Sequence, residues 1–157
     1  MTANTYADYK RHIRSSVAEY GRFGILVGPT PVLFPTTKGI AAEEGGVIQA
    51  TDPPLRFKDG ARPRVLEVVR VIKSTIELLR YTYHYERPNG YFFRYEREYT
   101  TDLIRKPEYH MDVILDLPHF VAPPVNLEII LKLIANNFYS QDIYSRQIIG
   151  NEIHLTV

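Results

Sequence analysis

The feature that most constrains this chain is a pair of tyrosine-rich segments on either side of a turn signal. Residues 78–86 and 91–99 flank Asn89-Gly90, a dipeptide favoured in tight β-hairpin turns because both residues tolerate a positive φ. Half of the chain's 12 tyrosines lie in this region. Each tyrosine combines a large apolar ring with one polar tip, which suits a half-buried sheet face or a binding surface. We therefore predict an antiparallel hairpin and expect any functional site on or beside it.

Alternation of side chains divides such a hairpin into two faces. For a loop of two or four residues, facing positions sum to an odd number, although a bulge would change this. One face then carries Tyr81, Tyr83, Tyr85, Phe92, Arg94, Glu96 and Glu98. The other carries Arg80, Thr82, His84, Glu86, Phe93, Tyr95, Arg97 and Tyr99.

The first of these faces predicts a candidate site. Arg94 is suited to hold a phosphate or stabilise an oxyanion, and Glu96 to act as a general base. The side chains expected to contact a substrate are Tyr81, Tyr83, Tyr85, Tyr95 and Arg97. The alternative is an ordinary cross-strand ion pair on a packed sheet, which contributes little energy.

Glu67 is a second catalytic candidate. It lies in the β-branched segment 63–72, where alternation places it with Val65, Val69 and Val71. If that face is buried, the carboxyl is desolvated and its pKa rises, as is common at functional sites. If the opposite face forms the core, Glu67 is simply exposed.

His110 is the third candidate, because alternation places it on the same side of a strand as Asp112. Such a pair can ligate a metal or act as an acid–base couple. We find no third ligand beside the two and expect neither a metal nor another cofactor. The alternative is a pair of surface side chains without a function.

The remaining patterns predict the elements around the hairpin. Apolar spacings of three and four predict helices over residues 6–20 and 126–138. Short strands are expected at 23–27, 47–50, 55–57, 63–72 and 109–115. We expect a loop or short helix over 38–46, and a small hairpin or terminal strand within 143–157. The chain is predicted to form one α+β domain, residues 1–157, with an antiparallel meander sheet packed by an N-terminal and a C-terminal helix.

Composition excludes several classes of function. The chain has no cysteine, so disulfides, thiolate metal sites and a cysteine nucleophile are excluded. The net charge of +1 gives no global attraction to nucleic acid, so any such binding must come from a local patch. No window approaches the roughly 18 apolar residues of a membrane span, and no signal peptide is apparent. The absence of cysteine fits a reducing cytosol, and we expect a protein that does not enter a membrane.

Short motifs follow one another in order between residues 55 and 136. They are Leu55-Arg56-Phe57-Lys58-Asp59-Gly60, Leu66-Glu67, Tyr81-Thr82-Tyr83-His84-Tyr85, Phe92-Phe93-Arg94-Tyr95-Glu96-Arg97, the segment 107–113, and Pro124 before the last helix. This order resembles the TumE-like family, the toxin components of prokaryotic toxin–antitoxin pairs. The chain departs from that family at Glu96-Arg97, where an Asp-Asn pair is usual, and at His110, where paired histidines are usual.

The resemblance implies a helix-turn-helix antitoxin as partner and RNA as target. Two functions remain open. In the first, a toxin-like ribonuclease uses Glu96 or His110 to activate the 2′-hydroxyl, while Arg94 holds the phosphate and tyrosines stack on unpaired bases. In the second, the protein is a non-catalytic module that binds nucleic acid or another protein in a defence or regulatory system. Convergence of Glu67, Arg94, Glu96 and His110 would favour the first, whereas carboxylates on separate faces would count against it.

Overall fold

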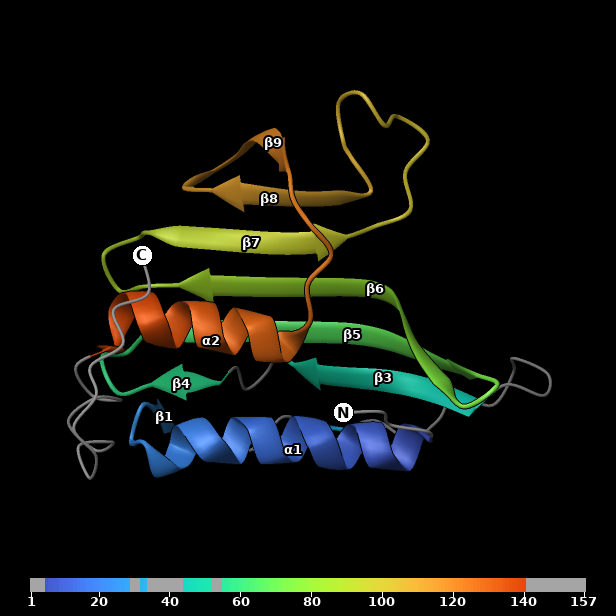
Figure 1. Ribbon diagram of the computed structural model, residues 1–157. Coiled ribbons are helices and arrows are strands. Elements are labelled where there is room, and N and C mark those ends of the chain that lie inside the picture. The colour runs from blue at the N-terminus through green and yellow to red at the C-terminus, as the bar shows by residue number, and fades with distance from the viewer. Residues whose placement is uncertain (1–4, 29–31, 34–43, 52–54, 141–157) are drawn as a thin grey trace, which may run out of the picture.

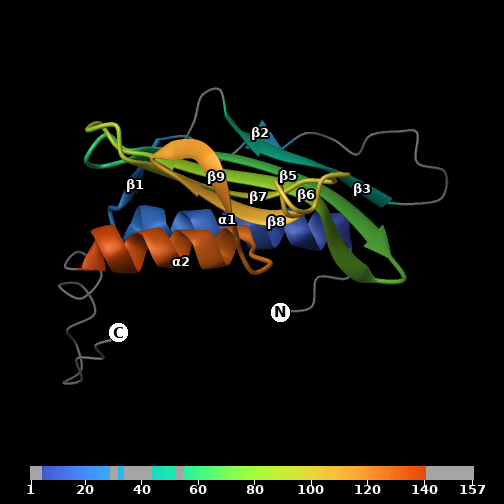
Figure 2. The ribbon, with the colours of Figure 1, turned by 90° about the horizontal axis from the view of Figure 1, so that it is seen from above.

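The fold consists of two layers, a mostly meandering antiparallel sheet and two helices on one of its faces (Figures 1 and 2). It is seen in a computed structural model that describes residues 5–28, 32–33, 44–51 and 55–140. The predicted α+β architecture, with a helix from each end of the chain packed on an antiparallel sheet, is confirmed. The predicted loop or short helix over 38–46 is wrong for residues 44–46, which form a strand, and its remainder lies outside the described residues, as does the prediction for 143–157.

The elements follow one another along the chain as α1 (Tyr6–Arg22), β1 (Leu26–Val27), β2 (Val32–Leu33), β3 (Glu44–Ala50), β4 (Arg56–Phe57), β5 (Arg62–Ile72), β6 (Thr75–Glu86), β7 (Phe92–Arg97), β8 (Tyr109–Val113), β9 (Leu115–Val121) and α2 (Leu127–Phe138). The main sheet has the order β2-β3-β5-β6-β7-β8-β9, and β1 pairs separately with β4. Within the described residues every pairing is antiparallel. None of the described helices is long and apolar enough to cross a membrane.

Both helices begin at a capping side chain and bury one apolar stripe. The Thr5 hydroxyl accepts a hydrogen bond from the Asp8 N–H at the start of α1, and Asn126 does the same for Ile129 at the start of α2. The buried residues of the two helices are Tyr6, Tyr9, Ile13, Ser16, Val17, Leu127, Ile130, Leu131, Ile134 and Ala135. The predicted spacing is therefore confirmed, and α1 extends to Arg22.

Three hairpin tyrosines form the sheet side of the core. Tyr81, Tyr83 and Tyr85 are 2%, 1% and 0% exposed, and each polar tip has a partner. The Tyr81 hydroxyl accepts a hydrogen bond from the Val125 N–H (3.1 Å), and the Tyr85 hydroxyl lies 3.3 Å from that of Tyr139. Buried phenols with satisfied hydroxyls add apolar area without an orphaned polar group.

The β6–β7 hairpin has a different register from the predicted one. Its loop contains three residues, 88–90, because the fixed φ of Pro88 suits the first central position of a type I turn. Gly90 then takes the left-handed position, with φ of 84°. Facing positions consequently sum to an even number, as for Tyr83 opposite Tyr95. The prediction that Arg94 and Glu96 share a face with Tyr81, Tyr83 and Tyr85 is therefore wrong.

Glu67 joins the two helices to the sheet. The predicted alternation of β5 is confirmed, since Val65, Glu67 and Val69 point inward and Glu67 is 0% exposed. Its carboxylate accepts hydrogen bonds from the hydroxyls of Tyr83 (2.6 Å) and Tyr9 (2.9 Å) and from the Leu127 backbone N–H. Burial raises the pKa of Glu67, and these three donors lower it by less.

The raised pKa predicts a pH-dependent contribution to stability. A carboxyl whose pKa is higher in the folded state stabilises the fold fully below its unfolded pKa. That contribution is lost as the pH rises through the folded pKa. We expect the unfolding free energy of the natural protein to fall more than that of Glu67→Gln between about pH 5 and about pH 8.

The measurement is chemical denaturation at a series of pH values, with the exposed Glu19→Gln as control. The control should follow the natural protein. A Glu67→Gln curve parallel to that of the natural protein would contradict this account of Glu67.

Candidate functional site

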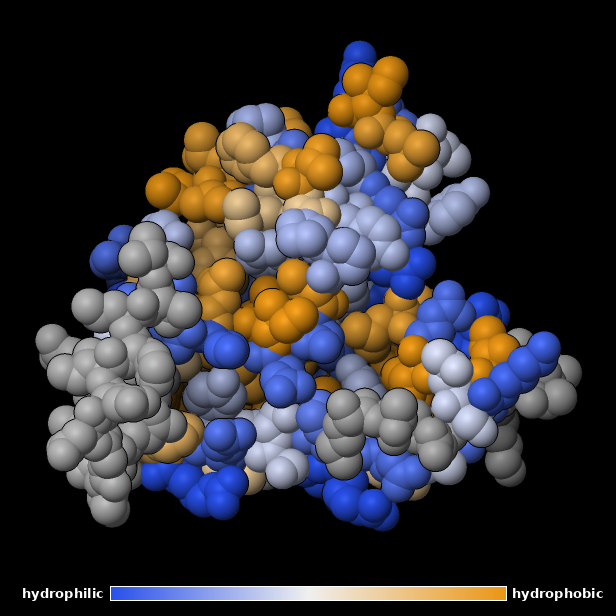
Figure 3. All heavy atoms as spheres, in the orientation of Figure 1, coloured by the Kyte–Doolittle hydropathy of each residue, from blue (hydrophilic) through white to orange (hydrophobic). Residues whose placement is uncertain are grey.

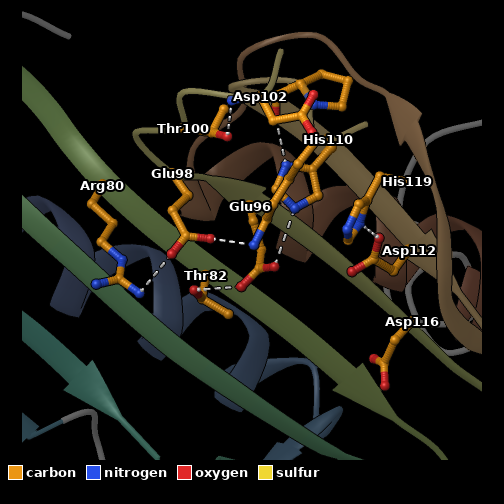
Figure 4. Close-up of polar contacts among 12 residues, drawn as sticks. Arg80, Thr82, Glu96, Glu98, Thr100, Asp102, His110, Asp112, Asp116 and His119 are labelled. Carbon is orange, nitrogen blue, oxygen red and sulfur yellow. Dashed lines mark hydrogen bonds and ion pairs between the residues drawn. The ribbon is translucent and has the colours of Figure 1, made fainter. Parts of the chain in front are cut away.

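The face of the sheet opposite the helices carries a group of charged side chains from β7, β8 and β9. We call this group the carboxylate–histidine cluster; it consists of Arg94, Glu96, His110, Asp112 and His119 (Figure 4 shows all of these except Arg94). Register places its members on that face. The row Leu66, Thr82, Glu96, His110 runs across four strands, and the row Arg64, His84, Arg94, Asp112 lies beside it.

His110 and Glu96 form the first couple of the cluster. His110 is fully buried, and its Nδ1 lies 2.8 Å from the Pro107 carbonyl oxygen. A carbonyl only accepts, so Nδ1 carries a proton. The Nε2 atom points at Glu96, 3.3 Å from Oε2, without a hydrogen bond. The other Glu96 oxygen accepts a hydrogen bond from the Thr82 hydroxyl (3.1 Å), so the carboxylate stands between Thr82 and His110 (Figure 4).

Asp112 and His119 form the second couple. Asp112 is 0% exposed, and its Oδ1 lies 2.7 Å from His119 Nδ1. Its Oδ2 accepts hydrogen bonds from Arg94 Nη2 (2.5 Å) and Nε (3.1 Å). The two histidine rings meet edge to face, with centroids 4.7 Å apart. The two couples therefore form one continuous polar group.

Arg94 is held among three carboxylates. Besides Asp112 it contacts Glu96 (Nε to Oε2, 3.2 Å) and Asp116 (Nη2 to Oδ1, 3.1 Å). Burial alone would lower the pKa of Arg94, but the Asp112 hydrogen bond and the charges of Glu96, Asp112 and Asp116 outweigh burial and raise it. One guanidinium among three carboxylates leaves excess negative charge, which a cation or protonated imidazoles would balance.

The cluster also has the composition of a metal site. One ligand atom from each of His110, Asp112 and His119 lies within 4.8 Å of the others. Two imidazoles and a carboxylate are ligands that divalent transition metals accept.

The predicted catalytic residues fall on both faces of the sheet. Arg94, Glu96 and His110 converge, with the contacts given above. Glu67 does not join them, because it points to the helices on the opposite face. Three of the four residues therefore converge, but the carboxylates of Glu67 and Glu96 lie on separate faces, so the predicted four-residue site is wrong and Glu67 belongs to the core.

The residues predicted to contact a substrate lie on the helix-covered face. Tyr81, Tyr83 and Tyr85 are buried there, so their rings are not open to a base. Tyr95 is half-buried on the same face, opposite Tyr83. Arg97 hydrogen-bonds to Glu108 (2.9 Å) and to the Leu78 carbonyl. Each of these residues therefore packs or pairs away from the cluster.

Sequence reasoning missed His119 and Asp116 because residues 115–121 were expected to be a connection. They form β9, which turns back on β8 through Ile114, a β-branched residue with φ of 64°. Asp116 and His119 follow Asp112 by four and seven residues, a spacing that matches no motif in the sequence. Only the hairpin pairing gives that spacing a meaning.

Exposed arginines lie next to the cluster on the same face. Arg64 belongs to the row that contains Arg94, and Arg80 is 53% exposed with Glu98 at 3.6 Å. Burial, Arg64 and Arg94 lower the pKa of His84, which stands between the two arginines in that row, although Glu86 opposes them. His84 is therefore driven towards its neutral form.

Comparison of the chain with models of protein families, with curated proteins and with solved structures gives no match. The functional argument therefore rests on the geometry of the cluster and on the motif order of the sequence.

Removing Arg94 should destabilise the protein because Asp112 would remain buried without its guanidinium. We expect Arg94→Ala to lower the unfolding free energy by about 3 kcal/mol, as for other broken buried pairs. The matched control is Arg80→Ala, on the same face, whose exposed pair should contribute at most about 0.5 kcal/mol. Thermal and chemical denaturation measure both. Equal losses in the two variants would show that Arg94 does not hold the cluster together.

Proposed function

We propose that this protein is a toxin-antitoxin-type RNA-cleaving enzyme whose site is the carboxylate–histidine cluster. The observation that carries the proposal is the burial of His110 and Asp112 next to the partly exposed Glu96 and His119, on the sheet face that the helices leave free. Buried ionisable groups cost folding energy, and they concentrate where chemistry needs them. RNA as the substrate class, and a cytoplasmic location, follow from the resemblance to the TumE-like family.

Glu96 is the residue that we assign to proton transfer. Its side chain is 15% exposed, and it is held by Thr82 and next to His110. In the proposed reaction Glu96 accepts the proton of the RNA 2′-hydroxyl, whose oxygen attacks the neighbouring phosphorus. The bond from phosphorus to the 5′-oxygen breaks, that oxygen takes a proton from a solvent water molecule, and the Glu96 proton then passes to the hydroxide that is left. The products are a 2′,3′-cyclic phosphate and a 5′-hydroxyl.

The exposed arginines are assigned to substrate binding. Arg94 is engaged by three carboxylates, so its charge is largely balanced, and it acts by positioning Asp112 and Glu96. Arg64 lies in the same row and is exposed. An exposed arginine in the row that leads to the cluster suits a contact with the phosphate backbone of a single strand.

A binding role without catalysis is the second candidate, and a different surface favours it. Strand β9 is the edge of the sheet and exposes apolar side chains around it (Figure 3): Ile114, Leu115, Leu117, Phe120 and Val121. Exposed apolar residues on an edge strand are typical of protein contacts. An antitoxin of the helix-turn-helix class, as the family resemblance implies, is the partner that we propose for this surface in either case.

The catalytic proposal predicts that expression of the protein alone stops growth and degrades RNA. Glu96→Gln keeps the shape of the side chain but cannot take up a proton, so we expect cleavage to fall by about 10²- to 10⁴-fold. The control is Glu77→Gln, a carboxylate at the start of β6 that pairs with Arg70. Cleavage of a labelled single-stranded RNA by purified protein is the measurement. Equal activity of both variants would exclude Glu96 as the base, and harmless expression of the natural protein would favour the binding role.

The proposed contact between Arg64 and RNA predicts that a substitution of Arg64 affects RNA binding separately from the proton transfer assigned to Glu96. Arg64→Gln should weaken RNA binding and reduce the slope of log affinity against log salt by about 0.7, the value for one phosphate contact with a single strand. Fluorescence anisotropy at several salt concentrations measures the slope. Arg14→Gln, which removes an exposed cation from α1, should leave it unchanged. If the two variants show the same affinity and the same salt slope, RNA does not contact Arg64.

A further inference from the structure

The carboxylate–histidine cluster contains one buried nitrogen without a hydrogen bond. His110 is 0% exposed, and its Nε2 has no hydrogen-bond partner. The atom points into the cluster, towards Glu96 and the ring of His119. Buried polar atoms of this kind are rare in native proteins and require an explanation, of which a bound ion is one.

Both histidines are oriented as metal ligands are. The proton of His110 Nδ1 is held by the Pro107 carbonyl (2.8 Å), which leaves the lone pair on Nε2. Metal-bound histidines typically fix one ring nitrogen on a carbonyl or carboxylate in this way and present the other to the ion. His119 Nδ1 lies 2.7 Å from Asp112 Oδ1, so these two atoms are adjacent, as two ligand atoms of one ion are, and a bound metal would displace the Nδ1 proton.

The charges of the cluster favour a bound cation. With its proton on Nδ1, a neutral His110 places its Nε2 atom only 3.3 Å from a Glu96 oxygen, an unfavourable contact between two acceptors. The three carboxylates around Arg94 add further negative charge. A positive ion at Nε2 would relieve both.

We propose that His110, Asp112 and His119 bind one divalent transition-metal ion, of the zinc, cobalt or manganese type. Ligand atoms from these residues already lie within 4.8 Å of one another. Two imidazoles disfavour Mg²⁺ and Ca²⁺, which prefer oxygen ligands. Three protein ligands leave a coordination position open, as in catalytic zinc sites. The proposal replaces the expectation that the chain needs no metal, because His119 supplies the missing third ligand.

A role of this ion in cleavage rests on the proposed function, whereas its binding does not. The ion would add positive charge beside Glu96, where the substrate phosphate has to approach a cluster with excess carboxylate. Glu96 remains outside the ligand set and keeps its proposed part in proton transfer.

The test is calorimetric titration of the full chain, stripped with a chelator, with Zn²⁺ and with Mg²⁺. We expect one Zn²⁺ per chain, no comparable heat with Mg²⁺, and at least a tenfold lower Zn²⁺ affinity for His119→Gln. The matched control is His84→Gln, which removes a histidine from the same face outside the cluster and should bind Zn²⁺ normally. The proposal is overturned if the natural protein binds no Zn²⁺, or if the two variants bind it equally.

A second measurement needs no variant and covers the case in which His119→Gln fails to fold. Co²⁺ added to the natural protein should broaden the imidazole NMR signals of His110 and His119 but not those of His84. Equal broadening of all three would overturn the site. RNA cleavage in excess chelator by protein that binds no metal would refute this inference and leave the proposed function intact. Zinc binding without any RNA cleavage would do the reverse.

Discussion

The buried carboxylate of Glu67 is the interaction on which the arrangement of the layers depends. It receives hydrogen bonds from Tyr9 of α1, from Tyr83 of β6 and from the first backbone N–H of α2. One side chain thus joins both helices to the centre of the sheet. The positive end of the α2 dipole adds to the stabilisation of the anion, while burial opposes it. Because both helices are held on this face, the opposite face of β6, β7 and β8 is left for polar side chains.

The length of the loop in the β6–β7 hairpin determines which side chains of β7 lie on each face of the sheet. A loop of three residues places Phe93 and Tyr95 with the buried tyrosines and turns Arg94 and Glu96 to the other side. A loop one residue shorter or longer would exchange the two sets, because side chains alternate with a period of two. Pro88 and Gly90 therefore decide which residues meet His110 and Asp112.

The carboxylate–histidine cluster is formed by strand pairing and not by any local motif. β7 contributes Arg94 and Glu96, β8 contributes His110 and Asp112, and β9 returns to add His119. Burying these groups weakens the sheet unless each finds a partner, and Arg94 compensates part of that cost through Asp112. His110 Nε2 is a buried nitrogen of the cluster without a hydrogen bond. It is also one of the ligand atoms of the metal site that we propose.

The sequence by itself determined the helices, the buried face of β5 and the existence of the hairpin, since apolar periodicity and turn residues act locally. It also indicated Arg94, Glu96 and His110 as candidate catalytic residues. It did not determine which of them meet, because the hairpin register depends on a competition between Pro88-Asn89 and Asn89-Gly90 for the centre of the turn. Nor did it reveal His119, which reaches Asp112 only after β9 folds back. The tertiary structure alone decided that Glu67 and the tyrosines stabilise one face of the sheet while the cluster occupies the other, because contact across strands depends on register.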